Sequence, residues 1–308
     1  MLNVPNPLLI LAMDHRAVMR GLFGDGLTPE QQTERFGHAK DLAFRALLEV
    51  ADAGLVQPAN TGVLIDDQYG SAVIPKVKDA GYTLILPVEA SRSPKFDIRT
   101  GEFILEHGDD FGDHLPLGTV DMVKALIVHN PALEEDRRRR QVERAATVSK
   151  WAIDNGVPFM LELLCPPTAE QLEEAGDLDT YRRTAHADLV CRSIDEYQAG
   201  GVWPSVWKLE PLASDDDYRR VSAQCLGGAP HETSLILLGG GADLDQVETW
   251  LREINGVPGF IGFAIGRSLW QNEFRELFAG RATDEETVAG IRANIERVVG
   301  AYTGAAAK

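Results

Sequence analysis

Cysteine is scarce in this 308-residue sequence, and the three that occur form no recognisable pair. Cys165, Cys191 and Cys225 have no C-x-x-C spacing, so the sequence predicts neither a disulfide framework nor a zinc knuckle. The seven histidines likewise form no H-x-H or H-E-x-x-H pattern, which gives no support to zinc-dependent chemistry. We therefore expect neither a metal ion nor a bound cofactor.

Basic residues and long apolar runs are also in short supply. Lysine and arginine number 30 against 47 acidic residues, for a formal net charge of −17. Such a chain repels nucleic acid and anionic membranes at long range, so neither is an expected partner. The apolar run near the start is short, and no basic residue precedes it, so the sequence predicts no signal peptide and no membrane span. We expect a cytoplasmic protein whose partner is a small molecule, and a homo-oligomer is left open.

Eight short apolar runs alternate with amphipathic stretches along the chain, without a low-complexity linker. Continuous apolar runs are typical of parallel strands that are covered on both faces. The expected strands are residues 8–14, 62–66, 82–89, 121–129, 158–165, 206–211, 234–240 and 259–266. The alternation of expected strands and helices, together with the chain length, predicts a (β/α)8 barrel that forms a single domain over residues 1–308. An open doubly wound sheet is the alternative, but it usually carries G-x-G-x-x-G after its first strand, where this chain has "MDHR".

Amphipathic patterns predict the helices between these strands. They cover about 29–52, 134–155, 179–199, 215–225, 243–254 and, near the end of the chain, 283–300. Thr28 and Pro29 are a typical N-cap and first helical residue. The arginine-rich block within 134–144 has acids at helical spacing, which indicates a solvated, salt-bridged helix face. Segment 90–120, after the third strand, is too long for an ordinary loop and shows no clear helix, so we expect a lid or a decorative hairpin.

Polar residues inside or at the ends of the expected strands indicate a site, because barrel enzymes build their sites at the carboxyl ends of the strands. They are Asp14, Asp66, Glu89, Lys124, Glu162 and Lys208. An ionised lysine in a covered strand is costly unless an acid pairs with it. Glu162 and Glu210 are available to Lys208, so a structural ion pair is the alternative to a chemical role.

Two lysines, a glutamate and an aspartate at one barrel mouth suit Schiff-base chemistry. The nucleophile of such a reaction must be a neutral amine, which burial and a neighbouring cation both favour. We predict that Lys208 is the nucleophile and that Lys124 is the neighbouring cation. Dehydration and carbon–carbon cleavage also need a proton donor and acceptor, and Glu162 is the candidate.

The turns after the last two strands are candidates for phosphate binding. In barrels, the loops after strands 7 and 8 often hold phosphate through backbone N–H groups, with help from the N-terminus of a following helix. The turn "GGGAD" supplies Gly239, Gly240 and Gly241, while "GRSLW" supplies the Arg267 guanidinium and Ser268, an expected N-cap.

Other side chains near the expected mouth are weaker candidates. His15 and His129 could orient substrate hydroxyls. Gln68 in "DDQYG" could touch the substrate, although N-capping of the next helix by Asp66 or Asp67 explains that segment more simply.

Eight segments in the same order carry a resemblance to a known family: "LAMDHR", "GVLIDDQYG", "PVEASR", "VKALIVHNP", "FMLELLCPPT", "VWKLEPL", "LGGGAD" and "GVPGFIGFAIGRSLW". They resemble class I aldolases of the tagatose-1,6-bisphosphate aldolase type, most closely the aldolase domain of myo-inositol catabolism. The resemblance implies a Schiff base on Lys208 and proton transfer by Glu162. It also implies that Lys124 and Asp14 line the site and that Arg267 binds phosphate.

The same resemblance implies a substrate. It would be 5-dehydro-2-deoxy-D-gluconate 6-phosphate, cleaved to dihydroxyacetone phosphate and malonate semialdehyde. Gly240 stands where the inositol-type domain is expected to have a basic residue, so tagatose 1,6-bisphosphate and 6-deoxy-6-sulfofructose 1-phosphate stay open as substrates. Arg92 and Lys95 are the expected contacts for a second anionic end. A sugar-phosphate-binding module without turnover is the alternative outside enzymes.

Overall fold

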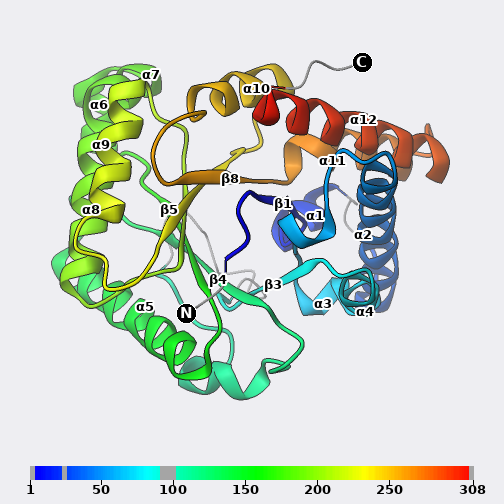
Figure 1. Cartoon of the computed structure of the whole chain (residues 1–308), viewed down its shortest axis with the longest axis horizontal. Helices are drawn as coiled ribbons and strands as arrows, with labels where there is room; N and C mark the ends of the chain where they lie inside the picture. Colours follow the sequence, from blue (N-terminus) through cyan, green and yellow to red (C-terminus); the bar gives the residue numbers. More distant parts are fainter. Residues whose placement is uncertain (1–3, 23–25, 91–101, 305–308) are drawn as a thin grey trace.

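The structure, a computed structural model, describes residues 4–22, 26–90 and 102–304, and in it eight parallel strands close into a barrel in sequence order (Figure 1). The strands are β1 (Leu8–Ala12), β2 (Thr61–Leu64), β3 (Thr83–Pro87), β4 (Met122–Val128), β5 (Phe159–Leu164), β6 (Val206–Leu209), β7 (Ser234–Leu238) and β8 (Phe260–Ile265). Each coincides with an expected strand, usually with shorter ends. The (β/α)8 barrel is therefore confirmed.

The seam between β1 and β8 closes the barrel. Leu9 pairs with Phe263 and Leu11 with Ile265 across it. The indole Nε1 of Trp270 also donates a hydrogen bond to the Ala12 carbonyl, at 2.9 Å. The first and last strands of the barrel are thus joined by backbone pairing and by a side chain of the last βα unit.

Helices surround the barrel on its outer side. They are α1 (Arg16–Leu22), α2 (Pro29–Asp52), α3 (Asp67–Gly70), α4 (Ile74–Asp79), α5 (Glu135–Asn155), α6 (Ala169–Ala175), α7 (Leu178–Tyr181), α8 (Ala187–Ala199), α9 (Asp215–Leu226), α10 (Leu244–Glu253), α11 (Arg267–Phe278) and α12 (Asp284–Thr303). The last of these packs against α2, α10 and α11 (Figure 1). A helix able to cross a bilayer, which needs roughly 20 apolar residues, does not occur within the described ranges.

Local signals explain where several of these helices begin and end. Thr28 forms a capping box with Gln31, which fixes the start of α2. The helix begins and ends at its predicted boundaries, 29 and 52. The expected helix 179–199 is present as α7 and α8, joined by a π-helical turn, η3 (Arg182–His186). On α5, Arg139 pairs with Asp136 and Glu143, which confirms the salt-bridged face.

Segment 90–120 differs from its prediction. Its described part contains a 3-10 helix, η2 (Gly108–His114), so the expectation of no helix is wrong. A single antiparallel bridge joins Glu89 to Leu105. Arg92, Lys95 and most of the suggested hairpin lie outside the described residues.

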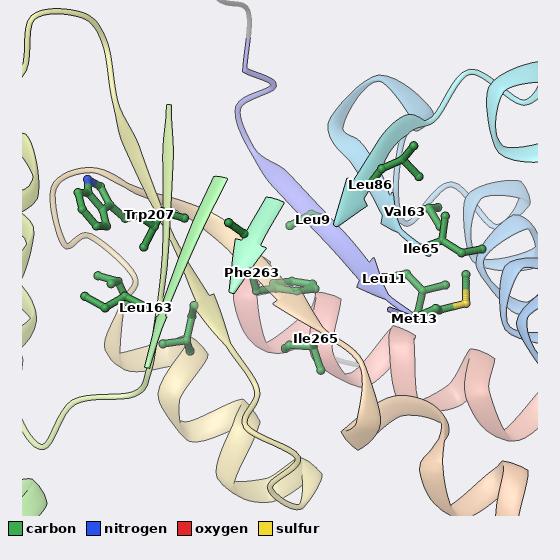
Figure 2. Packing of buried hydrophobic residues seen from close by; sticks show 14 of the residues in the cluster. Leu9, Leu11, Met13, Val63, Ile65, Leu86, Leu163, Trp207, Phe263 and Ile265 are labelled. Carbon is green, nitrogen blue, oxygen red and sulfur yellow. The ribbon is translucent and has the colours of Figure 1, made fainter. Parts of the chain in front are cut away.

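Apolar side chains alternate between the two sides of the barrel wall, as successive residues of a strand must. Met122, Met160 and Val206 belong to the cluster that fills the barrel interior. Residues of the other parity, including Leu163, Trp207 and Phe263, belong to the layer between strands and helices (Figure 2). Burial of each such side chain contributes about 1.5–3 kcal/mol. This alternation also fixes which side chains can reach the carboxyl-end mouth of the barrel from inside.

Candidate active site

Lys124, Glu162 and Lys208 lie inside the barrel because each stands two residues after an interior apolar side chain. Glu162 and Lys208 occupy paired positions on β5 and β6. All three side chains are buried, with exposed fractions of 1%, 6% and 2%. The predicted lysines and glutamate are thus brought together at the carboxyl end of the barrel.

The carboxylate of Glu162 bridges the two lysines. Its Oε1 lies 2.8 Å from Lys208 Nζ and its Oε2 lies 2.9 Å from Lys124 Nζ. Burial alone would raise the pKa of Glu162, but the ammonium groups of Lys124 and Lys208 lower it below its ordinary value. Glu162 is therefore a carboxylate at neutral pH, within hydrogen-bonding distance of both amines.

Lys124 is held by three carboxylates. Besides Glu162, Asp14 Oδ2 lies 2.9 Å and Glu89 Oε1 lies 2.6 Å from its Nζ. Burial opposes the charged form of Lys124, but Asp14, Glu162 and Glu89 together raise its pKa well above the ordinary value. Lys124 is thus a permanent cation. Its role in favouring the neutral form of Lys208 stays a prediction.

The three carboxylates are not equivalent. Burial opposes ionisation of Asp14, but Lys124, together with His15 and Lys208, lowers its pKa strongly. Burial prevails at Glu89, whose pKa is raised despite Lys124. Glu89 was among the polar residues expected at the strand ends but was given no chemical role, although it follows β3 with the parity of the interior residue Ile85, the signal that could have placed it beside Lys124.

The two histidines expected near the mouth have different surroundings. His15 Nδ1 lies 3.5 Å from Asp14 Oδ1, and its side chain keeps 25% of its surface exposed. Burial, opposed by Asp14, lowers the pKa of His15 to about 4, so its imidazole is neutral at pH 7. His129 is fully buried and faces α8, where its Nε2 lies 2.9 Å from Glu196 Oε2. The expectation that His129 orients substrate is wrong, because its parity directs it outward.

Residues around Gln68 serve mainly to anchor the start of α3. Asp66 caps the helix by accepting a hydrogen bond from the Tyr69 N–H, as expected. Asp66 also forms an ion pair with Lys40 of α2, and both side chains are fully buried. Gln68 lies on α3, two residues after Asp66. Its contact with substrate stays a prediction.

The turn after β7 contacts Arg267. Nη2 of Arg267 donates a hydrogen bond of 2.8 Å to the Gly240 carbonyl. Gly240 and Gly241 have φ of 58° and 79°, a region that favours glycine. A Cβ on Gly241 would lie 2.8 Å from Arg267 Cζ, and one on Gly239 would lie 3.5 Å from Ser268 Oγ. The predicted phosphate-binding residues therefore form one cluster, apart from Arg92, which lies outside the described residues.

Ser268 is not the N-cap of α11. The N-cap is Gly266, and the helix begins at Arg267. A Cβ at position 266 would lie 2.3 Å from the Ala12 carbonyl oxygen, so the close approach of β1 requires glycine there. The chain turns into helix earlier than the serine suggested, and Ser268 lies in the first turn.

Metal chemistry has no evident site in the described ranges. They contain no group of three or more His, Cys, Asp or Glu side chains placed to hold a metal ion. Cys165 is buried, and burial raises the pKa of its thiol to about 12, so it is no thiolate nucleophile at neutral pH.

Two solved structures have a similar fold. Cgl0159 from Corynebacterium glutamicum (Brevibacterium flavum) is 18% identical, with a TM-score of 0.55 over 96% of this chain and 85% of that one. The fructose-bisphosphate aldolase from Plasmodium falciparum, crystallised with TRAP and a small-molecule inhibitor, is 12% identical, with a TM-score of 0.63 over 99% of this chain and 93% of that one. At these identities the similarity shows the fold alone.

Sequence comparison gives a family but no relative. No curated protein sequence matches the chain. One family model matches residues 3–306, almost the whole length. The chain therefore belongs to the family described as "Uncharacterized protein conserved in bacteria (DUF2090)".

Proposed function

We propose that the protein is a class I aldolase that cleaves a phosphorylated keto-sugar or keto-sugar acid through a Schiff base on Lys208. The observation that carries this proposal is the bridge of one buried carboxylate, Glu162, between Lys208 and Lys124. Glu162 and Lys124 would already form a complete ion pair. Burying the second ammonium group, that of Lys208, beside the same carboxylate costs further desolvation energy that a purely structural ion pair would not require. A fold shared with a fructose-bisphosphate aldolase supports the proposal at the level of architecture.

Imine formation begins with proton transfer. The ammonium of Lys208 gives a proton to Glu162 Oε1, 2.8 Å away, and the neutral amine adds to the ketone carbon. The amine proton moves to the former carbonyl oxygen, which gives a neutral carbinolamine. Glu162 then returns its proton to the departing hydroxyl, so water leaves and an iminium ion remains on Lys208.

Cleavage uses the same carboxylate. Glu162 accepts the proton of the hydroxyl on the carbon β to the iminium, and the electrons of the carbon–carbon bond move into the iminium. An aldehyde leaves and an enamine remains. Glu162 protonates the enamine carbon, and water then hydrolyses the new iminium to release the ketone product and the Lys208 ammonium. Lys124 stays charged throughout and holds Glu162 in place.

The cluster of Arg267 and the Gly239–Gly241 turn suits a phosphate on the ketone side. We propose 5-dehydro-2-deoxy-D-gluconate 6-phosphate as substrate, with dihydroxyacetone phosphate and malonate semialdehyde as products. Tagatose 1,6-bisphosphate and 6-deoxy-6-sulfofructose 1-phosphate fit the same chemistry and differ at the far end. None of these steps requires a metal or an organic cofactor.

Borohydride trapping tests the proposal. Dihydroxyacetone phosphate with borohydride should leave a reduced adduct that peptide mass mapping places on Lys208. Lys208→Arg should give no adduct while the fold remains, because arginine keeps the charge facing Glu162 but not a neutral amine. An adduct on another lysine, or binding of the ligand without any adduct, would sink the mechanism. The second of these outcomes is the one expected of a binding module without turnover.

A further inference from the structure

A cavity of about 250 Å³ lies at the carboxyl ends of β4 and β5. Val128, Leu133, Pro166 and Pro167 form its apolar walls, and Arg137 of α5 also lines it. A single water needs only about 10–15 Å³ of such space, so the cavity has room for several waters. A polar group carried on two or three carbons therefore fits.

The strand register places this cavity just above the catalytic level. Leu126, Glu162 and Lys208 occupy paired positions on β4, β5 and β6. Val128, where the cavity begins, lies two residues further along β4 and shares the interior parity of Leu126. At about 3.3 Å per residue, the cavity opens roughly 7 Å above Glu162 and Lys208. That spacing matches the reach of a short carbon fragment from the scissile bond.

The cavity also lies across the mouth from Arg267. In a closed barrel of eight strands in sequence order, β4 stands opposite β8, after which Arg267 follows. A linear substrate with its phosphate at Arg267 and its ketone carbon at Lys208 therefore directs its other end toward β4 and β5. This is the end that leaves as the aldehyde.

The walls of the cavity are fixed by one buried side chain. Asn130 Nδ2 donates to the Pro166 carbonyl at 2.8 Å and to Gln171 Oε1 at 2.7 Å. Its Oδ1 accepts a hydrogen bond of 2.9 Å from the Ala132 N–H. The loops after β4 and β5 are thereby tied together, so the cavity is formed before a ligand enters, which lowers the cost of binding.

We propose that this cavity binds the aldehyde end of the substrate, and that this end carries an acid group recognised by Arg137. The inference rests on the proposed aldolase function and adds to it the cavity and the residue that hold the second acid group of its candidate substrates. Because the chain has a net charge of −17, an acid group needs a cation close by. The planar guanidinium fork suits a carboxylate, a phosphate or a sulfonate.

Arg137→Gln tests the inference, with Arg139→Gln as matched control. Arg139 lies on the same helix but does not line the cavity, and it pairs with Asp136 and Glu143 in solvent. The substrates are ketose phosphates that differ only at the last carbon: a hydroxymethyl group, a carboxylate, a phosphate or a sulfonate. Arg137→Gln should lower kcat/KM for the acid-ended substrates roughly 10- to 100-fold relative to the hydroxymethyl one. Arg139→Gln should leave this ratio unchanged from the wild type. In the wild type, the acid-ended substrate with the highest kcat/KM identifies the natural acid group.

A second pair of variants adds charge at the cavity rim. Ala169 lines the cavity and is the exposed first residue of α6, where an acidic side chain is tolerated. Ala169→Glu should lower kcat/KM for the acid-ended substrates by repulsion, whereas Ala169→Gln should change it little. Equal losses in both variants would indicate a steric effect and contradict the inference.

Trapping separates this inference from the proposed function. If wild-type protein forms no borohydride adduct on Lys208, both fail. If the adduct forms but Arg137→Gln leaves the preference between acid and neutral ends unchanged, the aldolase stands and the inference is overturned.

Discussion

Replacing each buried lysine by methionine should separate the stabilising role of Lys124 from the chemical role of Lys208. After Lys208→Met, Glu162 still pairs with Lys124 at 2.9 Å, so no buried carboxylate loses its last cation. After Lys124→Met, Asp14, Glu89 and Glu162 remain close together, and Lys208 contacts Glu162 at 2.8 Å.

The expected magnitudes differ accordingly. Removing one partner of a buried ion pair costs about 3–5 kcal/mol, whereas replacing a buried charge without stranding its partner is often neutral or stabilising. We expect Lys124→Met to lower the free energy of unfolding by at least 3–5 kcal/mol, a large part of the roughly 5–15 kcal/mol of a typical domain. Lys208→Met should change it by less than about 1 kcal/mol, and it should abolish borohydride trapping.

Urea denaturation at pH 7 and pH 5 measures both effects. In Lys124→Met, Asp14 and Glu89 lose their ammonium partner while Glu162 keeps Lys208, so the folded-state pKa values of Asp14 and Glu89 should rise above those of the unfolded chain. The folded variant then binds protons preferentially, and its deficit should shrink as the pH falls. Equal losses in the two variants, or a larger loss in Lys208→Met, would refute the assignment and make Lys208 a structural ion-pair partner.

Further predictions concern His15, the buried pair beside α3 and the glycine turn. The unfolded chain protonates His15 below about pH 6.5, but the folded chain does so only near pH 4. The free energy of unfolding should therefore decrease as the pH is lowered from about 6.5 to 4, and His15→Gln should reduce this decrease in urea midpoints. Asp66→Asn keeps the capping oxygen but leaves the Lys40 ammonium buried and unpaired, which should cost about 3–5 kcal/mol; adding Lys40→Met should restore most of it in the same assay. Gly241→Ala should raise KM for phosphorylated substrates several-fold, because its Cβ displaces the Arg267 guanidinium; an equal rise for an unphosphorylated ketose would contradict phosphate binding there. Activity measured after prolonged EDTA treatment should be unchanged, since imine chemistry needs no metal.

The strands and long helices could be predicted because their determinants are local. Continuous apolar runs located all eight strands, and Thr28 as N-cap with Pro29 as first helical residue located the start of α2. The short helices α1, α4 and α6 escaped prediction because they are about two turns at most and carry little periodicity. The start of α11 was misplaced because the constraint on Gly266 comes from Ala12, distant in sequence.

The site could be predicted in part for a related reason. Lys124, Glu162 and Lys208 stand out in the sequence because each interrupts an apolar strand. Glu89 could be recognised as a polar residue at the end of its strand, but its contact with Lys124 could not, because that contact depends on the register that pairs Pro87 with Lys124. Arg137 looked like one member of an arginine-rich helix face, and only the cavity distinguishes it from Arg139.

The seam between β1 and β8 has a consequence for synthesis of the chain. Residues 8–12 form an apolar strand that needs β8, whose residues are made about 250 positions later. At 5–20 residues per second, roughly 10 to 50 seconds pass before that neighbour exists. During this time one edge of β1 lacks its native partner and can pair with other chains. We therefore expect newly made chains to be most prone to aggregation before β8 emerges from the ribosome, and truncations before residue 260 to be insoluble.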